Sequence, residues 1–141
     1  MITYAIIKKL SDSSTVLNLD ENLYWEELPL QRDGKPAEGV WAVTRGGSAK
    51  ATPRGLNQKT IIDFYIVNAS KPKTEAEAEE IANWIRTNNG INSLSGQAGG
   101  VNYNYKNIRI WQTTTPQNQG ATPNGSIVKM VSALVVFDII K

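Results

Sequence analysis

The chain has 141 residues, with 15 Lys and Arg against 13 Asp and Glu, a net charge of +2, and no His or Cys. This length fits a single domain over residues 1–141. The near balance of charge does not indicate a strongly basic nucleic-acid protein. The missing His and Cys exclude a structural zinc site and remove imidazole and thiol catalysis.

The hydropathy pattern gives no sign of a membrane protein. No apolar run approaches the length of about 18 residues that a membrane-spanning helix needs. Residues 1–10 lack the basic-then-apolar order of a secretory signal. We therefore expect no membrane partner and, by default, a cytoplasmic location, which the absence of Cys fits.

The first third of the chain predicts one helix and two strands. Ile2, Ile6 and Leu10 recur at helical spacing and predict an N-terminal helix that ends in the polar run 11–14. Segments 23–28 and 40–44 are rich in aromatic and β-branched residues and predict strands. The Asp33-Gly34 pair between them favours a hairpin-like connection.

The middle of the chain predicts a central strand and an amphipathic helix. Residues 60–67 are too continuously apolar for a strand with one face in water. Thr74 and Glu77 form a capping box that predicts a helix start at Thr74. The helix carries one apolar face and ends at residues 88–90; the face comprises Ala78, Ile81, Ala82 and Ile85.

Two further strands are predicted at 105–112 and 127–137, so the order is helix, three strands, helix, two strands. The expected fold is α+β: a two-layer sandwich of a mixed or antiparallel sheet of about five strands with two helices. Three segments rich in Gly, Asn, Gln, Thr and Pro are predicted as long flexible loops: 46–58, 93–104 and 113–125.

Catalysis in this chain would need carboxylates. Glu26 and Glu27 are neighbours on a predicted strand and should point to opposite faces. Asp63 lies inside an apolar strand, where it is a candidate acid, a residue at a sheet edge, or a residue that faces a basic partner. Glu38 is the fourth carboxylate considered as a catalytic candidate. We expect no enzyme activity, no catalytic residue, no cofactor and no metal.

A basic stretch surrounds the first of the three polar segments. Gly46-Gly47 and Lys50 have the residue types of a phosphate loop but not its spacing. Arg45, Lys50, Arg54 and Lys59 have no acid among them. Because the segment has no aromatic residue to stack on bases, an acidic protein partner is favoured over nucleic acid.

Three of the four tryptophans are expected to pack in the core, and the fourth is a candidate for contact with another subunit. Trp25, Trp41 and Trp111 lie on predicted strands and are expected in the core. Trp84 lies beside the apolar face of its helix, so it is either a boundary residue of the core or an anchor at a subunit interface.

The order of these elements resembles the tail terminator (tail-completion) proteins of long-tailed bacteriophages. The resemblance covers nearly the whole chain: the N-terminal helix, the strand regions 23–28 and 40–44, the basic segment from Gly46, the strand before Thr74, its helix and the two closing strands. It implies a hexameric ring in the virion neck, assembled in the host cytoplasm. Such a ring sits on the tail tube, stops its polymerisation and meets the head-side connector, with DNA at most passing through its lumen.

The resemblance assigns roles only by charge and position. Arg45, Lys50, Arg54 and Lys59 are candidates for contact with the tail tube protein. Trp84 and Asp63, with the sheet edges, are candidates for contact between subunits.

Three other functions stay open from the sequence. The chain is also compatible with another phage neck, head-tail joining or minor capsid protein. A single-stranded nucleic-acid binder would use Tyr103 and Tyr105 beside Lys106 and Arg109. A small hydrolase using carboxylates and a metal would depend on Asp63.

Overall fold

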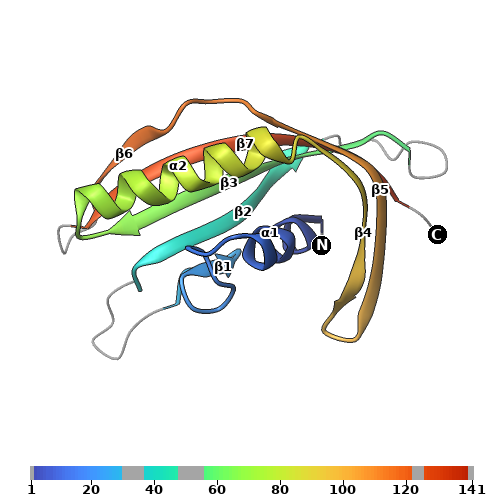
Figure 1. Cartoon of the computed structure of the whole chain (residues 1–141), viewed down its shortest axis with the longest axis horizontal. Helices are drawn as coiled ribbons and strands as arrows, with labels where there is room; N and C mark the ends of the chain where they lie inside the picture. Colours follow the sequence, from blue (N-terminus) through green and yellow to red (C-terminus); the bar gives the residue numbers. More distant parts are fainter. Residues whose placement is uncertain (1, 30–36, 48–55, 122–125, 140–141) are drawn as a thin grey trace.

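The computed structural model describes residues 2–29, 37–47, 56–121 and 126–139 (Figure 1). It contains two helices, α1 (Ile2–Ser13) and α2 (Lys71–Thr87), and seven strands. The strands are β1 (Leu23–Trp25), β2 (Gly39–Gly47), β3 (Gln58–Asn68), β4 (Gly90–Ala98), β5 (Val101–Gln112), β6 (Gln117–Ala121) and β7 (Ile127–Ile139).

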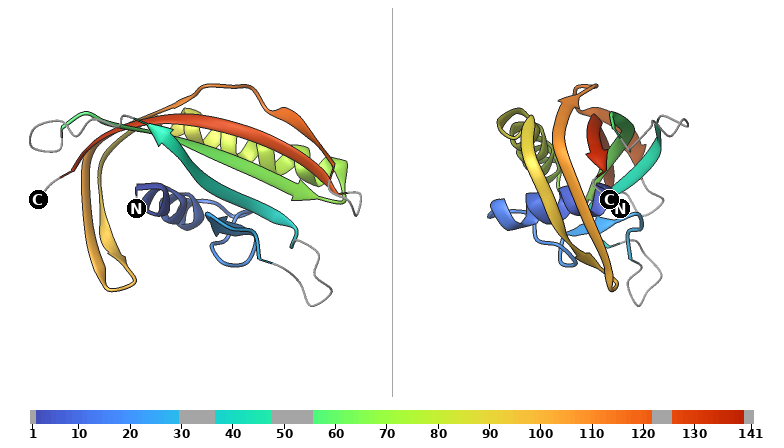
Figure 2. Two further views of the ribbon diagram at one scale, coloured as in Figure 1. Left: turned by 180° about the vertical axis from the view of Figure 1, so that it is seen from behind. Right: turned by 90° about the vertical axis from the view of Figure 1, so that its right-hand side faces the viewer.

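One mixed sheet joins all the strands in the order β1-β2-β3-β7-β5-β4, with β6 paired to β7. The α+β class, the two helices and the central position of β3 are confirmed. The number of strands was wrong, since the sheet has seven rather than about five. The simple two-layer picture also needs correction, because the β4–β5 end of the sheet curls round α1 into a half-barrel (Figures 1 and 2).

The hairpin-like connection between the first two strands was wrong. β1 and β2 are parallel, with Leu23 opposite Val40 and Trp25 opposite Ala42. Strand propensity does not distinguish parallel from antiparallel pairing, and here both Leu23 and Val40 are fully buried in the core. The Asp33-Gly34 pair lies outside the described residues.

The second polar segment is a hairpin, so the loop predicted at 93–104 was wrong. β4 and β5 pair from Gly90 opposite Arg109 to Ala98 opposite Val101. Gly99 and Gly100, at φ values of 58° and 80°, form the turn because glycine adopts positive φ without a Cβ clash. The loop predicted at 113–125 was wrong in part, because β6 lies within it.

Helix α2 begins one turn earlier than predicted. Ser70 is the N-cap and accepts a hydrogen bond from the Lys73 amide, and Pro72 lies in the first turn. Thr74 is inside the helix, where its hydroxyl donates to the Ser70 carbonyl at 3.0 Å. The capping box at Thr74 was therefore wrong, although the helix end at Asn88 and the predicted apolar face are confirmed.

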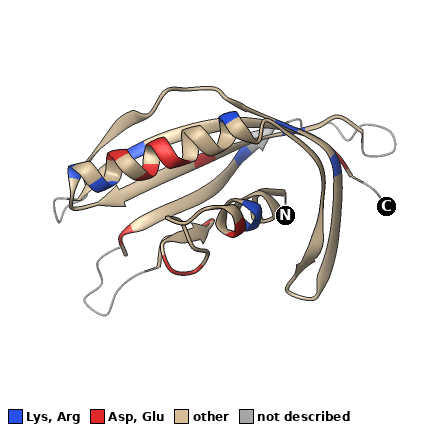
Figure 3. Ribbon diagram, in the orientation of Figure 1, with Lys and Arg blue, Asp and Glu red and all other residues tan. Residues whose placement is uncertain are grey.

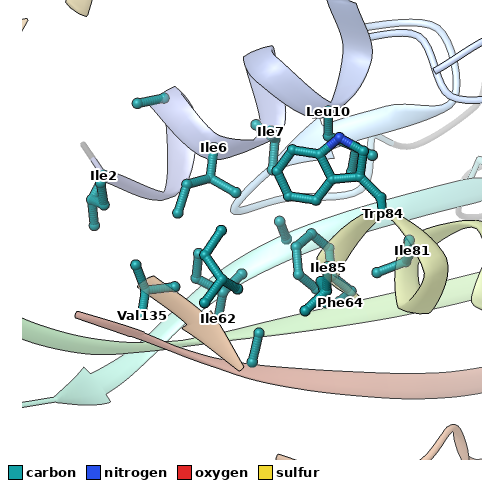
Figure 4. Close-up of a cluster of buried hydrophobic side chains, with 14 of the residues drawn as sticks. Ile2, Ile6, Ile7, Leu10, Ile62, Phe64, Ile81, Trp84, Ile85 and Val135 are labelled. Atoms are coloured by element: carbon teal, nitrogen blue, oxygen red, sulfur yellow. The ribbon is translucent and has the colours of Figure 1, made fainter. Parts of the chain in front are cut away.

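Both helices pack on the inner, concave face of the sheet (Figure 2). Figure 4 shows Ile6 and Leu10 of α1, Ile81 and Ile85 of α2, and Phe64 of β3 converging in one buried cluster. The predicted N-terminal helix is confirmed, with its apolar face in this core.

The outer face of the sheet carries no helix in the described part of the chain (Figure 2). Because side chains alternate along a strand, the residues next to the core positions of β2, β3 and β7 point outward. They are largely apolar and partly exposed: Trp41, Val43, Ile61, Tyr65, Met130 and Leu134. Trp41 and Tyr65 stack with ring centroids 4.8 Å apart. The prediction that Trp41 is a core residue was therefore wrong.

Neither described helix has the length and apolar character that crossing a membrane requires.

Candidate functional site

Asp63 is buried on the outer face, with 1% of its surface exposed. Arg45 donates from Nε to Asp63 Oδ2 at 2.7 Å and from Nη2 to Oδ1 at 3.3 Å. Ser132 Oγ also donates to Oδ1. The hydrogen bond to Asp63 and the charge of Asp63 raise the pKa of the Arg45 guanidinium. The three bonds together join β2, β3 and β7, so the group cross-links the sheet.

The other candidate carboxylates do not gather round Asp63. Glu26 accepts bonds from the Thr44 amide and hydroxyl, and Glu38 lies 3.9 Å from Lys73 Nζ. Glu26 and Glu27 lie beyond β1, so their placement on a strand was wrong. Within the described ranges, no three carboxylates are placed to hold a metal ion.

Trp84 is a core residue rather than a surface anchor. It is 6% exposed, and its indole Nε1 donates to Ser13 Oγ of α1 at 2.9 Å. Figure 4 shows the ring between α1 and α2. Of the two sequence alternatives, the structure supports the core, and little of Trp84 is left for a neighbouring subunit.

Of the four basic residues of the predicted contact loop, the structure describes Arg45 and Lys59. Lys50 and Arg54 lie outside the described residues. Arg45 is held by Asp63, and Lys59 pairs with Val136 at the start of β3. Their shared role in contacting a tail tube stays a prediction.

Lys59 lines a hollow of about 460 Å³ with Asn57, Arg109, Trp111, Leu134 and Val136. We call this set the basic groove. Its wall is apolar, and Trp111 is 46% exposed, so the prediction that Trp111 is a core residue was wrong. Arg109 donates to Asn57 Oδ1 at 3.2 Å, which holds the guanidinium at the rim.

A bulge in β5 creates the outward position of Arg109 and Trp111. Asn107 has a φ of 53°, and the register of β5 against β7 shifts between Lys106 and Arg109. Because of this extra residue, the inward positions change from Tyr103 and Tyr105 to residues of the opposite parity, Ile108 and Ile110. Asn is well suited to this left-handed conformation.

Asn107 and Asp138 hold the bulge in place. Asn107 Nδ2 donates to Asp138 Oδ2 at 2.9 Å, and the Asn57 amide donates to Oδ1 at 2.8 Å. Together these bonds lower the pKa of Asp138, with a smaller contribution from Arg109.

The same bulge argues against the nucleic-acid alternative. Tyr103 and Tyr105 are 9% and 7% exposed and stack on each other in the core, so they offer no platform for bases. Lys106 and Arg109 are exposed instead. The predicted surface of two tyrosines beside two cations was wrong.

A second hollow, of about 400 Å³, lies at the α1–β1 end of the molecule. We call it the acidic hollow; it is lined by Tyr4, Leu19, Asp20, Tyr24, Trp25, Glu27 and Pro29. Trp25 is 37% exposed, so its predicted place in the core was also wrong. Its ring contacts Tyr4 with centroids 5.2 Å apart. Burial, with the charges of Asp20 and Glu21, raises the pKa of Tyr24.

The sequence held a signal for Trp111 that the core prediction did not use. Ile108 and Ile110 alternate with Arg109 and Trp111, and an Arg shares a face with its neighbour two residues away. That face is therefore the solvent face. No comparable pattern marks Trp25, because β1 has only three residues.

Neither a protein-family model nor a curated protein matches this chain. A solved structure is similar over 99% of this chain and 95% of its own, with 19% sequence identity and a TM-score of 0.47. A likeness of this size carries no argument about function.

Proposed function

We propose that this chain is a structural virion protein, a tail terminator whose hexameric ring caps the tail tube and joins it to the head-side connector. The observation that carries the proposal is the outer face of the sheet. It has partly exposed apolar side chains, no described helix over it, and an exposed Trp111 in the basic groove. Apolar area rimmed by charge is typical of protein contact surfaces.

The polar chemistry of the chain supports a binding role over catalysis. Among the described residues of the outer face, the buried carboxylate of Asp63 is engaged by Arg45 and Ser132. Such a satisfied group stabilises the sheet and leaves no free base beside a nucleophile. We therefore propose that the protein acts by contact alone.

A ring of identical chains needs two different surfaces on each subunit, joined by a rotation that closes. Capping needs a third surface, which meets the tube. We propose the basic segment around Lys50 and Arg54 for this third surface. Asp63 and Trp84 then stabilise the subunit and do not face its neighbours.

Deleting residues 50–56 tests this role. The circular dichroism spectrum and the ring mass should be unchanged, whereas tail tubes polymerised with the variant should lose their length control, measured by electron microscopy. Replacing only Lys50 and Arg54 with Ala should act in the same direction. Replacing Lys8 and Lys9, both exposed on α1, is the matched control and should leave tube length normal. Normal tubes with the deletion variant would refute the tube contact.

A further inference from the structure

The chain carries two hollows of opposite charge, and each surrounds an exposed tryptophan. Trp111 is 46% exposed in the basic groove, and Trp25 is 37% exposed in the acidic hollow. The cavity volumes are close, at about 460 Å³ and 400 Å³. Tryptophan is one of the residue types enriched among the residues that dominate protein binding energy.

Among the described residues, no charged side chain of either hollow forms a salt bridge, although Arg109 lies close enough to Asp138 to attract its carboxylate. Lys59 and Arg109 form no salt bridge within the described ranges, and neither do Asp20 and Glu27 of the acidic hollow or the neighbouring Glu21. Elsewhere, opposite charges do meet, as in the Arg45–Asp63 pair. Charged side chains without a salt bridge, beside an exposed aromatic ring, can be neutralised by a protein surface of the opposite charge.

The two hollows cannot meet within one chain. The basic groove lies on the outer face of β3, β5 and β7, whereas α1, which contributes Tyr4 to the acidic hollow, packs on the inner face (Figure 2). Figure 3 shows acidic residues on the segment that follows α1 and basic residues where β5 bends. Within the described residues, neither hollow is therefore the partner of the other.

We propose that the acidic hollow of one copy docks on the basic groove of the next, so that Lys59 and Arg109 face Asp20 and Glu27. Two different complementary patches on one chain make a head-to-tail contact, which gives a ring when the rotation closes. This inference rests on the proposed ring-forming function and identifies the subunit surfaces that it requires. Trp111 also lines a smaller hollow of about 180 Å³, together with Arg86.

Charge reversal in two variants tests the docking. One variant carries Lys59→Glu with Arg109→Glu, which makes both of its surfaces acidic. The other carries Asp20→Lys with Glu27→Lys, which makes both basic. Each alone should associate at least about tenfold more weakly than the unmodified chain, measured by light scattering, because like charges then face each other.

The decisive arm is the equimolar mixture of the two variants. Every contact in an alternating ring of the mixture pairs an acidic with a basic surface, so assembly should return, and native mass spectrometry should find equal numbers of the two variants. Lys8→Glu with Lys9→Glu is the matched control and should assemble normally. Circular dichroism verifies the fold of each variant.

Three outcomes would overturn the docking. Rings that survive both reversals, or a mixture that stays dissociated although the unmodified chain forms rings, would refute these surfaces and leave the ring function standing. An unmodified chain that never assembles, in solution or on tail tubes, would contradict both the docking of the two hollows and the proposed ring function.

Discussion

Replacing Glu77 with Gln should stabilise the protein at neutral pH. Glu77 of α2 is 2% exposed and accepts a hydrogen bond from Asn68 Nδ2 at 2.9 Å. Asn68 is fully buried, and its Oδ1 is a buried acceptor without a hydrogen-bond donor in the structure. A Gln at position 77 keeps an acceptor for Nδ2 and adds an N–H donor that can reach Oδ1.

The expected increase in the free energy of unfolding has two sources, because Glu77→Gln removes two unfavourable contributions to the folded state. An unsatisfied buried polar group costs about 1–3 kcal/mol, and a buried carboxylate costs more when it is ionised. Allowing for imperfect geometry, Glu77→Gln should raise the free energy of unfolding by about 1 kcal/mol at pH 7. For a domain of this size, that raises Tm by roughly 4 °C.

The gain should depend on pH, because burial raises the pKa of Glu77 above its ordinary value of 4.5. The bond from Asn68 and the charge of Lys73 oppose this shift, whereas Glu38 adds to it. A raised pKa in the folded state means that Glu77 stabilises the fold fully below pH 4.5 and loses this contribution as the pH rises through the raised pKa. The Gln variant has no such loss.

Urea denaturation of both proteins across the pH range from acid to mildly alkaline measures the effect. The difference between Gln variant and unmodified chain should be small in acid and grow with pH. Glu77→Ala is the control; it leaves Asn68 without either partner and should destabilise at every pH. A constant difference across the range, or a Gln variant that is the less stable one above neutrality, would refute the reasoning.

Three further substitutions test the packing. Ser132→Ala removes a donor to the buried carboxylate of Asp63 and should lower the free energy of unfolding by about 1.5–3 kcal/mol; a loss under about 0.5 kcal/mol, measured by urea denaturation, would place the bond among neutral surface contacts. Trp84→Ala should cost about 3–5 kcal/mol, and Trp84→Phe clearly less, because it keeps most of the ring volume but loses the indole donor; equal losses in thermal denaturation would contradict the packing between the helices. Asn107→Val should cost about 1–2 kcal/mol because its φ is left-handed, whereas Asn107→Gly avoids that strain; a Val variant as stable as the Gly variant would show that the bulge is absent.

Periodic patterns in the sequence predicted the elements that bury a continuous apolar face. Ile2, Ile6 and Leu10 predicted α1, and the continuous apolar content of residues 60–67 predicted the central position of β3. The segment 127–137 was predicted as a strand, without its place in the sheet. In these segments burial alone determines the structure, so local sequence is sufficient. Helix α2 was found for the same reason, although Ser70 and Pro72 mark its start better than Thr74 does.

The elements that the sequence missed are stabilised by contacts with distant residues. Strand β4 is rich in Gly, Ser, Asn and Gln, and its pairing depends on β5 and on the Tyr103–Tyr105 stack against the core. The double glycine at 99–100 is typical of a hairpin turn, but the prediction of a loop at 93–104 followed the polar composition of the segment. The β1–β2 pairing was not predictable, because three residues of strand carry too little pattern.

The candidate site was predicted in part. The sequence identified Asp63 and Arg45 as unusual but could not pair them, because β2 and β3 bring them together only through the register of the sheet. It placed Trp25, Trp41 and Trp111 in the core by residue type alone. The exposure of Trp111 depends on the bulge at Asn107, and that of Trp25 on the end of β1.

The molar mass of the purified protein, measured by light scattering over a wide range of concentrations and with isolated tail tubes present, tests the central proposal most directly. The proposal predicts a hexamer, either free in solution or bound to the end of each tube. The mass of a single chain at every concentration, with tubes that bind none of it, would contradict the account.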